Sequence, residues 1–94
     1  MKSFAIAAAI STGLLFAANV YAQEDLAKKS GCMNCHDVSA KKAGPAFKDI
    51  AAKYKGKADA EAMLVTKLKE GKGHPAVKAS EADEKALVKW VLAM

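Results

Sequence analysis

The sequence predicts an all-α fold of three to five short helices, and three observations support that prediction. Apolar residues recur at spacings of three and four along several stretches, which is the helical period. No window alternates apolar and polar residues well enough to predict a strand. The run GCMNCH at residues 31–36 holds both cysteines of the 94-residue chain, which indicates a group attached at one turn between helices.

The first 22 residues have the pattern of a secretory signal peptide. Lys2 gives a positive start, residues 4–20 are apolar and alanine-rich, and VYA at residues 20–22 offers the small residues that signal peptidase reads. An uncleaved membrane anchor is the alternative, but this interrupted stretch is marginal for a span. Cleavage after Ala22 leaves residues 23–94 as one domain, which we expect in the periplasm of a Gram-negative type bacterium.

The first half of this domain predicts two short helices joined by a loop. Residues 24–30 form a helix candidate that Gly31 ends, and residues 37–44 are polar and loop-like. Residues 45–54 predict a second helix, because proline is tolerated in a first turn. Its apolar face consists of Phe47, Ile50, Ala51 and Tyr54.

The second half predicts two longer helices. Residues 56–58 connect to a helix that Asp59 could cap and that runs to about Glu70, before residues 71–75 break it. The run SEAD at residues 80–83 has the form of a capping box and begins a last helix. The apolar stripes of these two helices are Ala60, Leu64 and Leu68 with Val65 beside them, and Ala86, Leu87, Trp90, Val91 and Met94.

All basic residues of the chain are lysines. Without Lys2 the domain has 14 lysines against 10 acidic residues, a net charge near +4. Proteins that read nucleic acid usually employ arginine for base edges and phosphates, so we expect no nucleic-acid partner. The lysines could steer the protein towards acidic partner proteins, or they could simply form a solvated surface.

The C-x-x-C-H run indicates covalent attachment of one haem c. On a helical turn, residues i and i+3 lie on the same side, so Cys32 and Cys35 can each bond one vinyl group of a single haem. His36 is then held beneath the haem plane, where an imidazole nitrogen can reach the iron. A domain this small usually needs a staple, and an attached apolar macrocycle would supply one.

Two other chemistries use the same residue types. Thiol–disulfide exchange also uses C-x-x-C, but usually on a βαβ fold, and no strands are evident here. A zinc site could draw on Cys32, Cys35, His36 and His74, although the tight C-x-x-C-H run is a poor tetrahedral arrangement.

The chain resembles the class I c-type cytochromes of the small bacterial c-551/c-552 type. The resemblance covers nearly all of residues 23–94 and rests on LAKKSGCMNCH, AGPAFKDIAAKYKGKADAEA and SEADEKALVKWVLAM. It implies the cytochrome c fold, in which the first and last helices cross beside a covalently attached haem. It also implies thioether bonds at Cys32 and Cys35 and His36 as the proximal iron ligand. Further members of the implied pocket are Pro45, whose carbonyl accepts from the other nitrogen of that histidine, and the aromatic walls Phe47 and Trp90.

The chain departs from the family pattern at the second axial ligand, which in the family is a loop methionine. No methionine lies between Leu64 and Ala93, and the corresponding stretch GKGHPAVKAS contains His74. Met63 should point about 130° away from the buried stripe of its helix, and Met94 is the final residue. We therefore expect His74 to bind the iron, with an open position or a methionine ligand as the alternatives.

These expectations describe a periplasmic, monomeric single-electron carrier that is not an enzyme and has no stable membrane insertion. Two axial histidines should give it a lower reduction potential than a methionine ligand would. Its partners would be redox proteins with acidic docking patches, met by lysines such as Lys28, Lys29, Lys41 and Lys42. The alternative is a haem protein whose open or labile sixth site binds NO or CO as a sensor or carrier.

Overall fold

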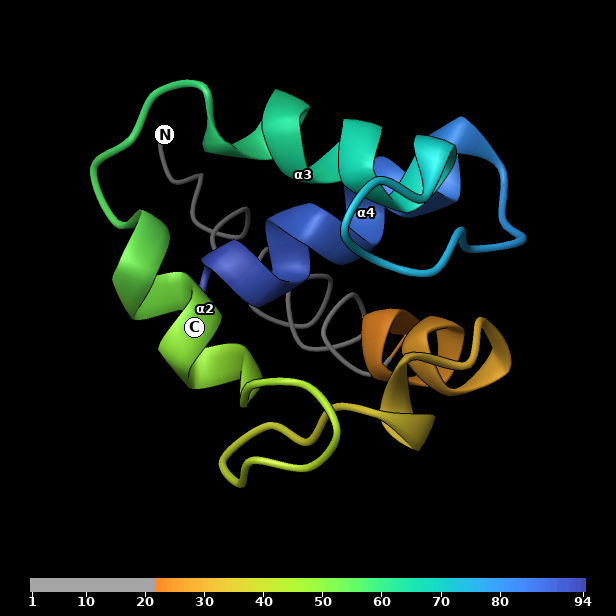
Figure 1. Ribbon diagram of the computed structural model, residues 1–94, viewed down its shortest axis with the longest axis horizontal. Coiled ribbons are helices and arrows are strands. Elements are labelled where there is room, and N and C mark those ends of the chain that lie inside the picture. The colour runs from red at the N-terminus through yellow and green to blue at the C-terminus, as the bar shows by residue number, and fades with distance from the viewer. Residues whose placement is uncertain (1–21) are drawn as a thin grey trace, which may run out of the picture.

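The computed structural model describes residues 22–94, and the regular structure in that range is entirely helical (Figure 1). A helix at residues 22–29 is followed by a 3-10 turn, η1 (Cys32–Asn34), and by α2 (Phe47–Tyr54), α3 (Ala60–Glu70) and α4 (Glu81–Leu92). The predicted all-α fold is confirmed. The expected signal peptide lies outside the described residues, apart from Ala22.

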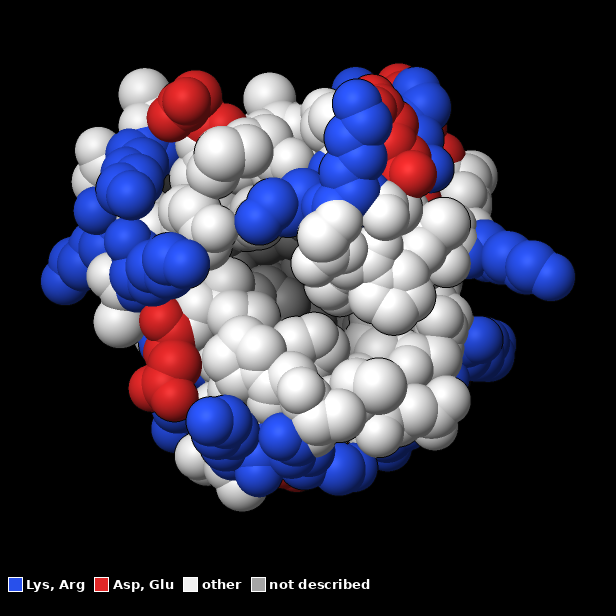
Figure 2. Space-filling view, in the orientation of Figure 1, with Lys and Arg blue, Asp and Glu red and all other residues white. Residues whose placement is uncertain are grey.

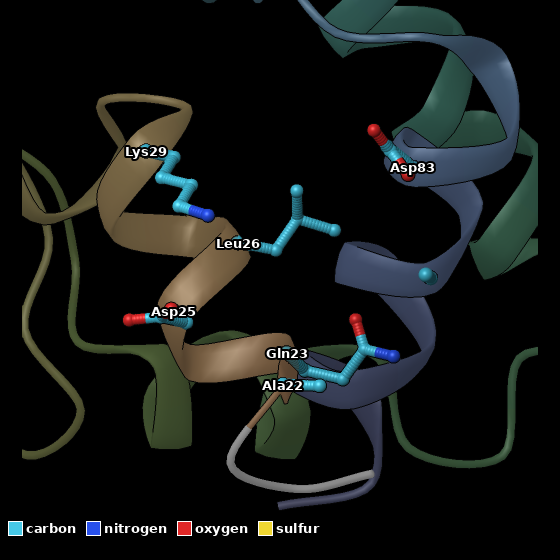
Figure 3. Close-up of a pocket in the computed structure, with 7 residues that line it drawn as sticks. Ala22, Gln23, Asp25, Leu26, Lys29 and Asp83 are labelled. Atoms are coloured by element: carbon cyan, nitrogen blue, oxygen red, sulfur yellow. The ribbon is translucent and has the colours of Figure 1, made fainter.

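The last helix, α4, is the centre of the arrangement. It packs against both α2 and α3, which lie on different sides of it (Figure 1). The helix at residues 22–29 faces α4 across an open pocket, and Leu26 and Asp83 point into this pocket from the two helices (Figure 3). Gln23 and Lys29 also line it, whereas no residue of the GCMNCH run does.

The start of α2 differs from the sequence-based prediction. The helix begins at Phe47, because Ala46 is still extended, with φ −62° and ψ 145°, so Pro45 lies outside the first turn. No side chain caps this end. Instead the Phe47 N–H donates to the carbonyl of Asp37 at 2.9 Å, so the loop at residues 37–46 folds back and satisfies a helix terminus with its own backbone.

The ends of α3 and α4 follow local sequence signals more closely. Asp59 precedes α3 as expected, but its side chain makes no capping hydrogen bond. Gly71 ends α3 in the left-handed conformation, at φ 73°, and its N–H donates to the Lys67 carbonyl. Ser80 caps α4 as predicted, since its Oγ accepts from the Asp83 N–H at 3.1 Å.

Within residues 22–94 the buried apolar core is small and comes from the helix at residues 22–29, from α2, α3 and α4, and from Ala46 directly before α2. Its members are Ala27, Ala46, Phe47, Ala51, Ala60, Val65, Leu87 and Val88. Half of these are alanines, whose burial removes little apolar surface from water. Met63 is 38% exposed, which confirms that it points away from the buried face of α3. Among residues 22–94, every helix is too short or too polar to cross a membrane.

Candidate functional site

The two cysteines and His36 lie on one compact turn. Gly31, at φ 85°, lets the chain leave the helix at residues 22–29 and enter η1. The His36 N–H donates to the Cys32 carbonyl at 3.0 Å, which holds the histidine directly beyond the turn. Cys32 is half-buried and Cys35 is exposed.

The chemistry of Cys32 disfavours the thiol-exchange alternative. Burial raises the pKa of the Cys32 thiol, with a smaller opposing contribution from a backbone hydrogen bond. Reactive cysteines of C-x-x-C redox motifs have a lowered thiol pKa, because the thiolate is the nucleophile. The environment of Cys32 instead raises the thiol pKa, so it favours the less reactive protonated thiol.

The ring of His36 is held from two sides. Its Nδ1 donates to the Pro45 carbonyl at 2.6 Å, the contact that the family resemblance implied. Its face lies on the ring of Phe47, with 5.1 Å between ring centres and 25° between planes. Because one nitrogen is fixed by a hydrogen bond, the orientation of the other is fixed as well.

Gly44 allows this close arrangement, and sequence reasoning missed its role. The Gly44 N–H donates to the Cys35 carbonyl at 2.7 Å, which brings the loop over the cysteine turn. A Cβ at this position would lie 2.5 Å from Cε1 and 2.9 Å from Nδ1 of His36, closer than real Cβ atoms come. The available signal was a glycine directly before Pro45, in a loop that returns to the cysteine turn.

His74 lies opposite His36, although the two residues are far apart in the chain. Their ring centres are 6.0 Å apart and their planes differ by 8°. The Nδ1 of His74 donates to the Pro75 carbonyl at 2.8 Å. Gly71 and Gly73, both at φ 73°, provide the turns that carry the loop back towards His36.

The separation of the two histidine rings is close to that of two imidazoles bound to one metal ion. A carbonyl oxygen only accepts, so Nδ1 of each ring is the donor, which leaves Nε2 as the nitrogen that a metal could bind. With an imidazole–metal bond of about 2.0 Å and a ring centre about 1.1 Å behind its nitrogen, two imidazoles on one iron have centres about 6 Å apart. The separation of 6.0 Å in this structure matches that requirement.

The aromatic side chains that were expected in the pocket continue the same cluster. The ring of Trp90 meets Phe47 edge-on, with 5.6 Å between ring centres and 71° between planes. The structure therefore brings His74, His36, Phe47 and Trp90 together in series. Figure 2 shows a hollow near the centre of the face in view, with a mainly uncharged rim.

Polar contacts that the sequence did not predict hold the loops around this cluster. The Asp37 carboxylate accepts from the N–H groups of Ser39 and Ala40, each at 3.1 Å, and these bonds lower the pKa of the Asp37 carboxyl. Lys42 donates to the Met33 carbonyl at 2.9 Å, across the mouth of the same loop. Lys42 was expected to serve docking, and this contact ties it to the cysteine turn.

Comparison with known proteins gives one consistent family. The family model described as cytochrome c matches residues 24–94. Cytochrome c-552 of Nitrosomonas europaea is 42% identical over 100% of this chain and 99% of its own length. Cytochrome c-551 of Pseudomonas aeruginosa is 39% identical, over 98% and 97%.

Solved structures agree with these sequence matches. Wild-type cytochrome c552 of Nitrosomonas europaea superposes with a TM-score of 0.68 and 48% identity, over 73% of this chain and 95% of that one. The class 1 cytochrome MtoD of Sideroxydans lithotrophicus superposes with a TM-score of 0.72 and 38% identity, over 79% and 94%.

Proposed function

Since the chain belongs to the cytochrome c family, we propose that it is an exported single-electron carrier in which histidines occupy both axial positions of the haem iron. Its cofactor is a covalently bound haem c, and its role is electron transport, as in the cytochromes c-551 and c-552 that it matches. The exported location, the ligands and the docking surface are the parts that we propose beyond the family assignment.

We assign the thioether bonds to Cys32 and Cys35 and the proximal ligand to His36. The support is the turn that presents all three residues together, with the His36 N–H bonded to the Cys32 carbonyl. Pro45 orients the imidazole by accepting from Nδ1 at 2.6 Å, which also makes the ring a stronger donor through Nε2. Phe47 and Trp90 form the aromatic wall beside it.

We assign the second axial ligand to His74, and one observation carries this assignment. Two nearly parallel imidazoles stand 6.0 Å apart, and each has its Nδ1 engaged by a proline carbonyl so that Nε2 is available. The competing methionines lie on the surface, since Met63 is 38% and Met94 39% exposed.

The bound haem supplies a one-electron change between ferric and ferrous iron. The side chains around it set how readily that change occurs. A second imidazole stabilises ferric iron more than a thioether does, so His74 should lower the potential relative to methionine ligation. With both axial positions taken by side chains of this protein, no position remains for a substrate, which supports a carrier over an enzyme.

The charge distribution supports docking to acidic partners on the side of the cysteine turn and α2. Residues 22–58 contain eight lysines against four acidic residues, whereas residues 59–94 contain six of each. All four ion pairs within the described residues lie in the second group. In Figure 2 lysines predominate along the left and lower edges of the face in view, with some acidic side chains among those on the left, whereas both signs adjoin closely at the upper right.

The docking surface that we propose includes Lys28, Lys29 and Lys41, which are exposed. Encounters of this kind are steered by charge and weakened by salt. Stopped-flow electron transfer to an acidic redox protein should therefore slow as ionic strength rises. A rate that does not depend on salt would contradict the docking proposal.

Export and maturation complete the proposal. We propose that residues 1–22 are a signal peptide and that residues 23–94 form the mature periplasmic domain, a monomer. The family match supports this division, because it begins at residue 24. Mass spectrometry of protein from the periplasmic fraction tests it, with cleavage after Ala22 and one haem per chain as the expected mass.

The ligand assignment is tested by spectroscopy on His74→Ala, with Met63→Leu as the matched control. His74→Ala should lose its low-spin spectrum and take up CO rapidly in the ferrous state, whereas Met63→Leu should behave as wild type. If wild type itself takes up CO rapidly at neutral pH, the sixth site is open and the protein is better described as a binder of small ligands.

A further inference from the structure

The loop that carries His74 is closed at its neck by an ion pair. Lys69 lies in the last turn of α3 and Glu81 is the first residue of α4, and Lys69 Nζ donates to Glu81 Oε1 at 2.6 Å. We propose that this pair is a latch: it positions His74 and limits how fast a small external ligand can replace it. The inference rests on the proposed ligation by His74.

The other attachments of this loop are few within the described residues. The Val77 N–H donates to the Leu68 carbonyl at 2.8 Å, and the Gly71 N–H ends α3. The remaining hydrogen bonds of the loop are local, including that between His74 Nδ1 and Pro75. When residues 71–80 swing outward and carry His74 with them, the contacts that oppose the movement at the neck are one backbone hydrogen bond and one ion pair.

The ion pair is well formed but exposed to solvent. The hydrogen bond from Lys69 is the main cause that lowers the pKa of the Glu81 carboxyl, and Lys85 adds to it from 3.7 Å. Both side chains are more than half exposed, so salt should screen the pair. Exposed pairs shift equilibria by about 1.5- to 5-fold. A shift of that size hardly affects the folding equilibrium. If the loop must open before an external ligand replaces His74, however, the replacement rate is proportional to the open fraction of the loop and changes by the same factor.

The chain offers a matched control for this pair. Lys89 and Glu61 also join α4 to α3, at 4.0 Å, but at the opposite end of the two helices from the His74 loop. Removal of either lysine deletes one exposed α3–α4 ion pair and one charge. Only Lys69 closes the neck of the loop.

The test is the rate of CO uptake by the ferrous, haem-loaded mature protein, measured by stopped flow at low ionic strength. Lys69→Ala should take up CO about 1.5- to 5-fold faster than wild type. Lys89→Ala should match wild type. Lys69→Arg, which retains the positive charge, should take up CO as slowly as wild type. Salt at about 1 M should raise the wild-type rate towards that of Lys69→Ala and leave that variant unchanged.

Two outcomes overturn the latch, and both differ from a failure of the ligand assignment. If uptake is slow in wild type and fast in His74→Ala, but Lys69→Ala behaves as wild type or no differently from Lys89→Ala, the latch is wrong and the ligand assignment stands. If wild type takes up CO as fast as His74→Ala, the ligand assignment fails and the latch fails with it. Thermal unfolding of both lysine variants shows whether a rate change merely follows lost stability.

Discussion

Substitution of Gly44 by alanine should disturb the imidazole of His36 without straining the backbone. Gly44 is not among the glycines with positive φ in the described residues, so alanine can adopt its conformation. The added methyl group, however, would lie 2.5 Å from Cε1 of His36, where an ordinary contact begins at 3.4 Å. The effect of this variant therefore reports mainly on the contact with the imidazole, which supplies the three atoms nearest to the added Cβ.

The size of the effect follows from the hydrogen bond that the ring must give up. A retreat of about 0.9 Å would stretch the Nδ1–Pro45 bond from 2.6 Å to at most about 3.5 Å, which is beyond the hydrogen-bond range. Because this bond is exposed, its loss costs about 0.5–1.5 kcal/mol. For a domain of this size each kcal/mol lowers Tm by about 4–8 °C, so we expect Tm to fall by roughly 2–12 °C. The reduction potential should rise, because an imidazole without its outer hydrogen bond is a weaker donor to ferric iron.

The assay combines thermal unfolding, followed by circular dichroism, with a redox titration of the haem-loaded protein. Gly56→Ala is the control, since Gly56 has φ 80° and nothing within 4 Å of an added Cβ. That variant should lose about 1–2 kcal/mol through backbone strain but keep the wild-type potential. A Gly44→Ala protein with wild-type Tm and potential would refute the reasoning, because the contact would then be relieved at no cost.

Three further predictions follow from the same contacts. Ser80→Ala should lower Tm by about 4–8 °C through loss of the α4 cap, worth about 1 kcal/mol, and a changed visible spectrum would contradict a purely structural role. Phe47→Ala should cost about 3–5 kcal/mol in urea unfolding, since Phe47 is only 4% exposed and packs on His36; a cost below about 1 kcal/mol would show that the ring is not part of the core. Because Lys69 lowers the pKa of Glu81, this carboxylate stabilises the fold above the ordinary pKa range of glutamate, and the stabilisation is lost as pH falls through the lower folded value. Urea titrations at a series of acid pH values should show this loss of stability in wild type and not in Glu81→Gln. If the free energy of unfolding depends on pH equally in both proteins, the Glu81 carboxylate does not contribute in this way.

Elements bounded by local signals were predicted well from the sequence. The helix α3 has its apolar stripe, its preceding aspartate and its terminal glycine within a dozen residues, and its bounds agree with the prediction. The start of α2 was predicted two residues too early. The first N–H of α2, that of Phe47, donates to the backbone carbonyl of Asp37. A backbone acceptor ten residues away leaves no side-chain pattern in the sequence, so it could not be predicted.

In the candidate site, too, local features were predicted from the sequence and the geometry of contacts between distant residues was not. The Cys32, Cys35 and His36 turn is local and was evident from spacing alone. The approach of His74 to His36 joins residues 38 positions apart and depends on how the loop is closed, so the sequence suggested the residue without its geometry. The steric role of Gly44 depends on an atom that glycine lacks, and it became visible only from the position of the His36 ring.

The most direct test of the central claim is the magnetic circular dichroism spectrum of the oxidised protein, recorded for wild type and His74→Ala. The account predicts a low-spin ferric haem with two nitrogen axial ligands in wild type, and loss of that signature in the variant. A sulfur-to-iron charge-transfer band in wild type, or identical spectra for the two proteins, would contradict it.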